Sequence, residues 1–311
     1  MEKKILIAID GSRSAELAVD YVGLMEGAMI RELKVALFNV MGSLPPDMVR
    51  QAEGDPVAFR RLAELRERYQ GQARQALEKA HHLLLRHGLE GEQIDSKAHP
   101  RTADIARDIL FEAEQGLYDA VVLGRRGLSK AQELFLGSVT NQVAQHADRL
   151  PVWVVGGRVA SLKVLCAVDG SEGSLKAVDH LAFMLGGNPE CKVDLLHVGA
   201  IFADYCPVDF TRPDKEGPTA VLDSGPEPCT PDFYRQALRL LKEGGLEEDQ
   251  IEVLERPGRP GVVGAILEEV RAGGYGTVVL GRRGEGGSSF LGHVSDRVLN
   301  KGGEVAVWIV G

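Results

Sequence analysis

The sequence predicts an α/β fold made of two tandem domains, each an open, mostly parallel sheet with helices on both faces. Short runs of Val, Ile and Leu alternate with amphipathic segments of helix length, which is typical of such sheets. Lys4–Ser12 is repeated at Lys163–Ser171, and Tyr118–Gly127 is repeated at Tyr275–Gly284. The 311 residues suffice for two domains of ordinary size. We expect domains at 1–157 and 161–311, joined by a short glycine-containing linker.

The first repeat has five apolar runs that predict strands and four amphipathic segments that predict helices. The clearest helix carries apolar residues at spacings of three and four from Leu62 to Leu83, and Gly88 follows as a stop. That apolar stripe is expected to be core. The expected strands are 4–9, 33–40, 92–98, 119–124 and 151–155, and the expected helices are 13–27, 57–87, 102–116 and 136–147.

The second repeat follows the same order. Its expected strands are 162–168, 191–198, 249–255, 276–281 and 305–310, and its expected helices are 172–185, 231–243, 260–272 and 291–300. The halves differ most at 199–231, which is rich in Pro, Asp and Gly. We expect a long loop there, either a flap over a site or a plain surface loop.

Composition excludes several classes of protein. The net charge is −9, with a pI near 5.5, so binding to nucleic acid is not expected. The four cysteines lie in the second half without metal-ligand spacing, which indicates reduced thiols. No apolar run reaches membrane-spanning length and no signal peptide is recognisable. We expect a soluble, cytoplasmic protein without a membrane partner.

A carboxylate follows the first strand. Asp10 ends the apolar run, and Gly11-Ser12 turns the chain into the next helix. At the carboxyl edge of a sheet, Asp10 can accept hydrogen bonds from an amino group or a ribose hydroxyl. It can equally be a structural residue that only satisfies the helix N-terminus. The residues around Asp10 leave both interpretations open.

A glycine-rich segment follows the fourth strand. Gly124-Arg125-Arg126-Gly127 is followed, after nine intervening residues, by Gly137-Ser138-Val139-Thr140 at the start of a helix. Glycines allow close backbone approach, and a helix N-terminus offers amide donors and a positive dipole end. The segment therefore suits a di- or triphosphate. Each arginine pair, Arg125-Arg126 and Arg282-Arg283, is expected on the solvated surface, with at most one member reaching the ligand.

Together, Asp10-Gly11-Ser12, Gly124-x-x-Gly127 and Gly137-Ser138 resemble the ATP-binding pattern of universal stress proteins, and both halves resemble that family along nearly their whole length. The resemblance implies a five-stranded parallel sheet of order 3-2-1-4-5 in each half, with ATP across the tips of the first and fourth strands. It places the adenine and ribose at Asp10 and the backbone near Val40. It places the phosphates at Gly127, Gly137, Ser138, Val139 and Thr140.

The second half departs from this pattern. Seven residues, not nine, separate Gly284 from Gly292, and His293 stands where the family has Ser or Thr. The shorter path and the bulkier imidazole alter the phosphate cradle, so the second half is the weaker candidate. Its corresponding residues are Asp169, Val198, Gly281, Gly284, Gly292 and Ser295.

The expected function is that of a stress-response module that binds ATP, or AMP or ADP, mainly in its first half, and acts through an unidentified protein partner. No Walker, nucleophile-elbow or kinase motif is present, so no catalytic residue is assigned. Mg²⁺ is expected only as a companion of the triphosphate. The alternatives are a slow ATPase or nucleotidyl-transferring enzyme, and an adaptor with vestigial sites.

The last strands of the two halves predict how the halves meet. Val152–Val155 and Val307–Val310 correspond residue for residue, and each would otherwise be an exposed edge strand. Pairing them would make an internal pseudo-dimer with Trp153 and Trp308 near its pseudo-twofold axis. Such a chain is stable without a partner, although two chains could still form a homodimer.

Overall fold

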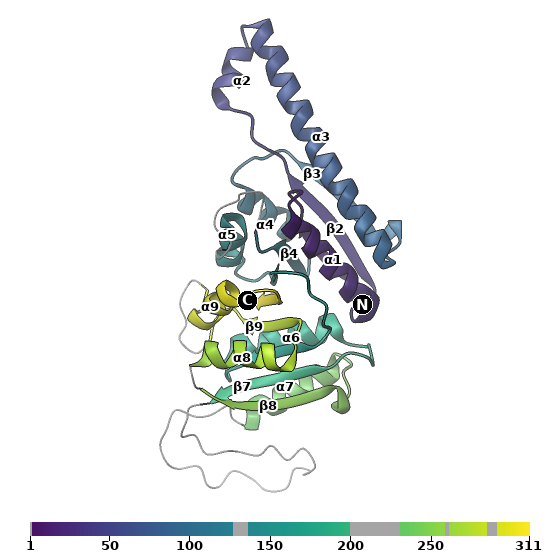
Figure 1. The fold of residues 1–311 in the computed structure, drawn as a ribbon, viewed down its shortest axis with the longest axis vertical. Helices are drawn as coiled ribbons and strands as arrows, with labels where there is room; N and C mark the ends of the chain where they lie inside the picture. The colour runs from purple at the N-terminus through teal and green to yellow at the C-terminus, as the bar shows by residue number, and fades with distance from the viewer. Residues whose placement is uncertain (1, 127–135, 200–230, 259–260, 285–290) are drawn as a thin grey trace.

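The structure is a computed structural model that describes residues 2–126, 136–199, 231–258, 261–284 and 291–311 (Figure 1). Within these residues the chain forms an α/β fold around one sheet, with helices on both faces. The expected loop at 199–231 falls almost wholly on residues 200–230, outside the described part of the chain.

The first half contains every strand and helix expected from its sequence, within a few residues of the expected bounds. The clearest helix ends where Gly88 adopts φ 102°, a conformation that glycine takes without strain. The strands are β1 (Lys3–Ala8), β2 (Leu33–Val40), β3 (Ile94–His99), β4 (Ala120–Gly124) and β5 (Val152–Val155). The helices are α1 (Arg13–Ala28), α2 (Pro46–Ala52), α3 (Pro56–His87), α4 (Ile105–Gln115) and α5 (Ser138–His146), with a 3-10 turn at Gly91–Gln93.

The second half repeats this arrangement, also close to the expected bounds. Its strands are β6 (Val164–Val168), β7 (Val193–Gly199), β8 (Ile251–Pro257), β9 (Thr277–Gly281) and β10 (Ala306–Val310). Its helices are α6 (Glu172–Leu185), α7 (Pro231–Glu243), α8 (Val262–Gly273) and α9 (His293–Lys301), with a 3-10 turn at Glu248–Gln250.

The strand order is β3-β2-β1-β4-β5-β10-β9-β6-β7-β8 in one ten-stranded sheet. Read from its outer edge toward the centre, each half keeps the expected order 3-2-1-4-5 with parallel pairing. The expectation of two tandem five-stranded sheets, one in each half, is wrong. The two last strands pair in antiparallel register, with Trp153 opposite Trp308, so two half-sheets that would each expose an edge become continuous.

The apolar cores are also shared between the halves. One layer lies under α1, α3, α6 and α7, and the other lies under α4, α5, α8 and α9. Alternate strand residues supply the two layers: Ile5 and Ile7 belong to the first and Leu6 belongs to the second. The two halves are therefore joined by hydrophobic packing as well as by strand pairing.

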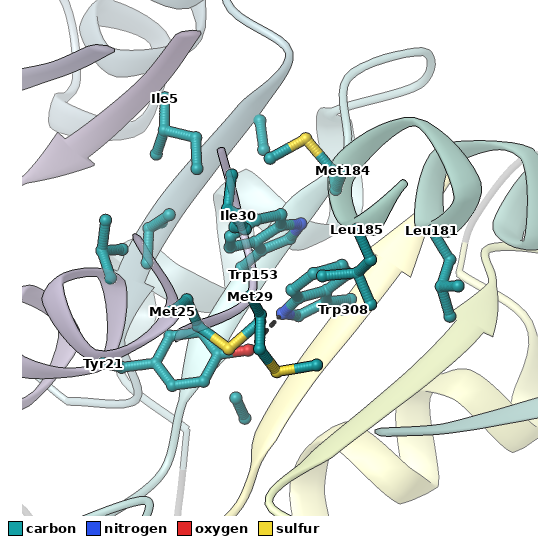
Figure 2. Packing of buried hydrophobic residues seen from close by; sticks show 14 of the residues in the cluster. Ile5, Tyr21, Met25, Met29, Ile30, Trp153, Leu181, Met184, Leu185 and Trp308 are labelled. Atoms are coloured by element: carbon teal, nitrogen blue, oxygen red, sulfur yellow. Dashed lines mark hydrogen bonds between the residues drawn. The ribbon is translucent and has the colours of Figure 1, made fainter. Parts of the chain in front are cut away.

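The pseudo-twofold axis passes through an aromatic pair. The rings of Trp153 and Trp308 stack with centroids 3.7 Å apart and an interplanar angle of 1° (Figure 2). The indole of Trp308 donates to the hydroxyl of Tyr21 at 2.9 Å, and the indole of Trp153 donates to Nε2 of His180 at 3.2 Å. Tyr21 also hydrogen-bonds Thr277 at 2.8 Å. The prediction of an internal pseudo-dimer with both tryptophans at its centre is confirmed.

The short helix α2 was not expected from the sequence. It begins at Pro46, directly after Pro45, and none of its residues is buried. Figure 1 shows α2 beside the first half of α3, and this pair extends beyond the sheet. Where α3 returns to the body of the protein, it passes the strand ends of the first half: Ala76 lies against Gly11, and Tyr69 lies against Gly42.

Candidate functional site

The first candidate residue, Asp10, follows β1 at the carboxyl edge of the sheet. Its side chain is exposed, and its Oδ1 accepts a hydrogen bond from the amide of Ser12 at 2.9 Å. Gly11 between them has φ 79°, which favours glycine. The hydroxyl of Ser12, not Asp10, caps α1 by accepting from the amide of Ala15 at 3.2 Å. Asp10 therefore stabilises the turn with one oxygen and is not the N-cap itself.

A buried amide that sequence reasoning missed fixes the chain just before Asp10. Nδ2 of Asn39 donates to the carbonyl of Ile9 at 2.6 Å, and the amide of Ile9 donates to the carbonyl of Phe38 at 2.8 Å. These bonds tie the end of β1 to the end of β2, where Val40 is the last residue. The sequence offered one signal for this role, because Asn39 is a polar residue within an otherwise apolar strand.

The strand β4 ends at Gly124, where it passes very close to α1. A β-carbon at Gly124 would lie 2.4 Å from the carbonyl carbon and oxygen of Ser14, so only glycine fits there. Because β1 and β4 are parallel neighbours, Asp10 and Gly124 lie at the same edge of the sheet.

The helix α5 begins at this same edge. The amide of Gly137 donates to the carbonyl of Arg125 at 2.8 Å, which attaches the start of α5 to the end of β4. Gly137 is the N-cap residue and supplies no side-chain cap. The first amide that donates within the helix is that of Asn141, to Gly137. The amides of Ser138, Val139 and Thr140 therefore have no acceptor inside α5, which is the usual condition of an anion-binding helix terminus.

The two hydroxyls expected at this helix terminus differ in availability. Ser138 is exposed. Thr140 is buried, and its Oγ1 donates to the carbonyl of Gly124 at 2.9 Å. The hydroxyl of Thr140 thus holds α5 against β4, and only its backbone amide remains for a ligand. Gly127 lies outside the described residues.

The second half has the corresponding geometry. The hydroxyl of Ser295 donates to the carbonyl of Gly281 at 2.7 Å, as Thr140 does to Gly124. The amide of Gly292 donates to the carbonyl of Arg282 at 2.8 Å, as Gly137 does to Arg125. His293, at the position of Ser138, is exposed.

Among the described residues, the carboxylate of the second half accepts one more hydrogen bond than that of the first. Oδ1 of Asp169 accepts from the amide of Ser171 at 3.1 Å and from its hydroxyl at 2.5 Å. A β-carbon at Gly284 would lie 2.3 Å from Oδ2 of Asp169, and one at Gly292 would lie 3.8 Å from the amide nitrogen of Gly284. Asp169, Gly284 and Gly292 therefore lie close together, and the side chain of Asp169 is exposed, as that of Asp10 is.

Next to Asp169, the second half carries a titratable side chain where the first half has Asn39. This residue, His197, precedes Val198 in β7. Burial lowers the pKa of His197, and the charges of Glu255 and Asp169 partly oppose that effect. The polar side chain beside the candidate carboxylate thus differs between the halves: Asn39 lies near Asp10, and His197 lies near Asp169.

The sequence model of the universal stress protein family matches residues 1–156 and 161–310. The chain belongs to the universal stress protein family. A universal stress protein of Mycolicibacterium smegmatis is 26% identical over 306 residues, which are 96% of this chain and 93% of that protein. Universal stress protein YxiE of Bacillus subtilis is 27% identical over 155 residues, which are 50% of this chain and 99% of that protein.

The solved structures agree on the fold of this universal stress protein. The crystal structure of a universal stress protein from Archaeoglobus fulgidus covers 99% of this chain and 97% of its own, with a TM-score of 0.61 and 19% identity. The similarity of fold therefore extends over nearly the whole length of both chains.

One arginine of each glycine-rich segment is not where the sequence indicated. Arg125 and Arg282 are 5% and 2% exposed, so the expectation of solvated surface pairs is wrong for these two. Arg283 forms an ion pair with Asp148 at 3.1 Å. The side chains of Arg125 and Arg282 cross between the halves instead of facing their own strand ends.

Neither a metal site nor a membrane helix is found in the described part of this universal stress protein. Among the described residues, no three His, Cys, Asp or Glu side chains gather as a metal site. None of the described helices is both long and apolar enough to cross a bilayer.

Proposed function

We propose that the first half of this universal stress protein binds ATP or a related adenine nucleotide, and that nucleotide occupancy regulates its action on a protein partner in a stress response. The base and ribose would lie at Asp10 and the backbone near Val40. The phosphates would lie at the glycine-rich segment and at the amides of Ser138 and Val139. The cytoplasmic location stays a prediction.

The observation that carries the proposal is the meeting of two kinds of polar group at one edge of the sheet. Asp10 supplies an exposed carboxylate, which accepts hydrogen bonds from amino and hydroxyl groups. The start of α5 supplies amides without an acceptor inside the helix, and they favour an anion. A molecule with a hydroxylated sugar at one end and phosphates at the other matches this pair of groups.

The first half is favoured because its carboxylate is less engaged. Both carboxylates are exposed, and among the described residues Asp10 accepts one hydrogen bond, from Ser12. In the second half, the hydroxyl of Ser171 donates to Asp169 in addition to its amide. A nucleotide at Asp169 would have to compete with this second hydrogen bond.

Calorimetric titration with ATP and with AMP tests the proposal through the carboxylate. In Asp10→Asn, the amide oxygen still accepts from Ser12, but the group facing the ligand becomes a donor. A lost hydrogen bond to a charged group weakens binding about 10-fold to 100-fold. Asp169→Asn makes the same change in the second half and should leave that affinity within about 2-fold, close to the scatter expected of an uninvolved site. The reverse pattern would assign the site to the second half.

A proline at the first position of α5 tests the phosphate end. Ser138→Pro removes one amide, and the helix tolerates it because Gly137 has φ −62° and ψ 145°, a conformation that suits the residue before proline. Ser138→Ala keeps the amide and removes only the hydroxyl. We expect Ser138→Pro to weaken ATP binding about 10-fold, the effect of one charge-assisted hydrogen bond. His293→Pro is the matched control, since Gly292 has φ −62° and ψ 152°. Equal losses in Ser138→Pro and His293→Pro would contradict the proposal.

A further inference from the structure

The side chain of Arg125 connects the first candidate site to the second half. Arg125 is the first residue after β4, and its side chain reaches into the second half. There its Nη1 donates to the carbonyl of Leu299 at 2.8 Å. Its Nη2 donates to the carbonyl of Asn300. Both acceptors lie in the last turn of α9, the helix whose first turn belongs to the candidate site of the second half.

Arg282 makes the reciprocal connection. Both of its terminal nitrogens donate to the carbonyl of Ala144 at 2.5 Å, in the last turn of α5. Arg282 and Arg125 occupy equivalent positions of the repeat, directly after Gly281 and Gly124. The same contact is therefore made twice, once in each direction.

The backbone carbonyls of these two arginines bind the N-termini of α5 and α9. The carbonyl of Arg125 accepts from Gly137 at the start of α5, and the carbonyl of Arg282 accepts from Gly292 at the start of α9. Each helix is thus bound at its N-terminus by an arginine of its own half and at its C-terminus by the arginine of the other half. The contacts form a closed circuit of Arg125, α9, Arg282 and α5.

The hydrogen bonds between these guanidinium groups and the helix carbonyls are expected to be strong. The last carbonyls of a helix carry the negative end of its dipole and lack partners within the helix, so a guanidinium satisfies both needs. Burial lowers the pKa of Arg125 and of Arg282, yet an arginine stays charged in a protein. A buried cation requires its hydrogen bonds, so losing these carbonyls would be costly.

We propose that Arg125 and Arg282 are exchanged positioning residues: each fixes the helix that forms the other half's candidate phosphate cradle, and the circuit couples the two cradles. The positioning part concerns the protein alone. The coupling part rests on the proposed function, because it needs a nucleotide in the first half. A ligand that displaces the start of α5 would also move Arg282 through Ala144, and Arg282 holds Gly292.

Amide hydrogen exchange without ligand tests the positioning part. Arg282→Ala removes the hydrogen bonds to Ala144 in the last turn of α5. We expect faster amide exchange at the opposite end of α5, at Gly137 and Asn141. Removing a charge-assisted hydrogen bond predicts at least about a 10-fold increase. Arg282→Lys keeps a cation at the helix end and should restore part of the protection. The control Thr277→Val deletes the hydrogen bond to Tyr21 in the same interface and should leave these two amides unchanged relative to the rest of the sheet.

Addition of ATP tests the coupling part. In Arg282→Ala we expect the affinity of the first half for ATP to fall about 5-fold, whereas in Thr277→Val it should stay as in the unmodified protein. Saturating ATP should slow amide exchange in α9 of the unmodified protein, and this effect should disappear in Arg282→Ala, which breaks the connection from Ala144 to Gly292.

The outcomes separate the two proposals. If no nucleotide binds but Arg282→Ala still releases the start of α5, the proposed function is wrong and the positioning role stands. If ATP binds and Arg282→Ala behaves as Thr277→Val in both measurements, the exchanged arginines have no positioning role. If the start of α5 is released but ATP leaves α9 unchanged, the coupling is wrong.

Discussion

Acidic pH should lower the free energy of unfolding of this protein through one buried histidine, which lies beside the tryptophan pair at the pseudo-twofold axis. His180 is 8% exposed, and its Nε2 accepts the indole N–H of Trp153, which requires an unprotonated nitrogen. Burial lowers its pKa from 6.5 to about 3. The folded protein therefore keeps His180 neutral at pH values where the unfolded chain takes up a proton.

The sign and size of the effect follow from this difference in pKa. Above pH 6.5 both states are neutral at this position and stability is unaffected. As the pH falls from 6.5 toward 3, protonation favours the unfolded chain, and one pH unit corresponds to about 1.4 kcal/mol. At pH 5, about 1.5 units below 6.5, the predicted loss of unfolding free energy is about 2 kcal/mol.

Urea unfolding at pH 7.5 and pH 5, followed by tryptophan fluorescence, measures this loss. His180→Gln is the informative variant because its amide oxygen accepts from Trp153 and does not titrate in this range. Other titrating groups act alike in both proteins, so the loss in the unmodified protein should exceed that in His180→Gln by about 2 kcal/mol. His82→Gln changes an exposed histidine on α3 and should keep the full pH dependence. Equal pH dependence of the unmodified protein and His180→Gln would refute the reasoning.

Two further predictions concern other buried groups. Gly124→Ala places a β-carbon 2.4 Å from backbone atoms of Ser14, which no side-chain rotation relieves, so we expect a loss of about 1–3 kcal/mol in thermal or urea unfolding. Gly71→Ala, at an exposed helical position with nothing within 4 Å, should instead stabilise the protein by about 0.5–1 kcal/mol; equal effects of the two changes would contradict the close approach of β4 and α1. Burial raises the pKa of the Cys166 and Cys191 thiols to about 12, so neither should react with iodoacetamide at pH 8 until urea unfolds the chain, as mapped by mass spectrometry. Rapid labelling of either residue in the folded protein would show that its surroundings open readily.

Much of the fold could be predicted because the relevant signals are local or repeated. Apolar runs and helical periodicity located the strands and helices, and the equivalence of Trp153 and Trp308 indicated which strands would pair. The helix α2 was missed because it is short, follows Pro45 directly and buries no residue, so it has no apolar stripe to recognise. The continuity of the sheet depends on how two edges meet, which periodicity within either half does not specify.

The candidate site was predicted in part. The start of α5 near residue 137 could be predicted from the glycine spacing, whereas the approach of Gly124 to α1 could not, because it depends on how that helix packs on the sheet. The burial of Arg125 and Arg282 could not be read from a turn of two arginines, because their acceptors lie in the other half of the chain. The hydroxyl of Thr140 was expected to face a ligand, but it bonds Gly124, a choice set by the packing of α5 on β4.

Crystals of this protein grown with ATP test the central claim most directly. Difference electron density should place the ribose beside Asp10 and a phosphate within hydrogen-bonding distance of the amides of Ser138 and Val139. Density for ATP at Asp169 alone, or at a site that touches neither Asp10 nor the start of α5, would contradict the assignment of the nucleotide to the first half.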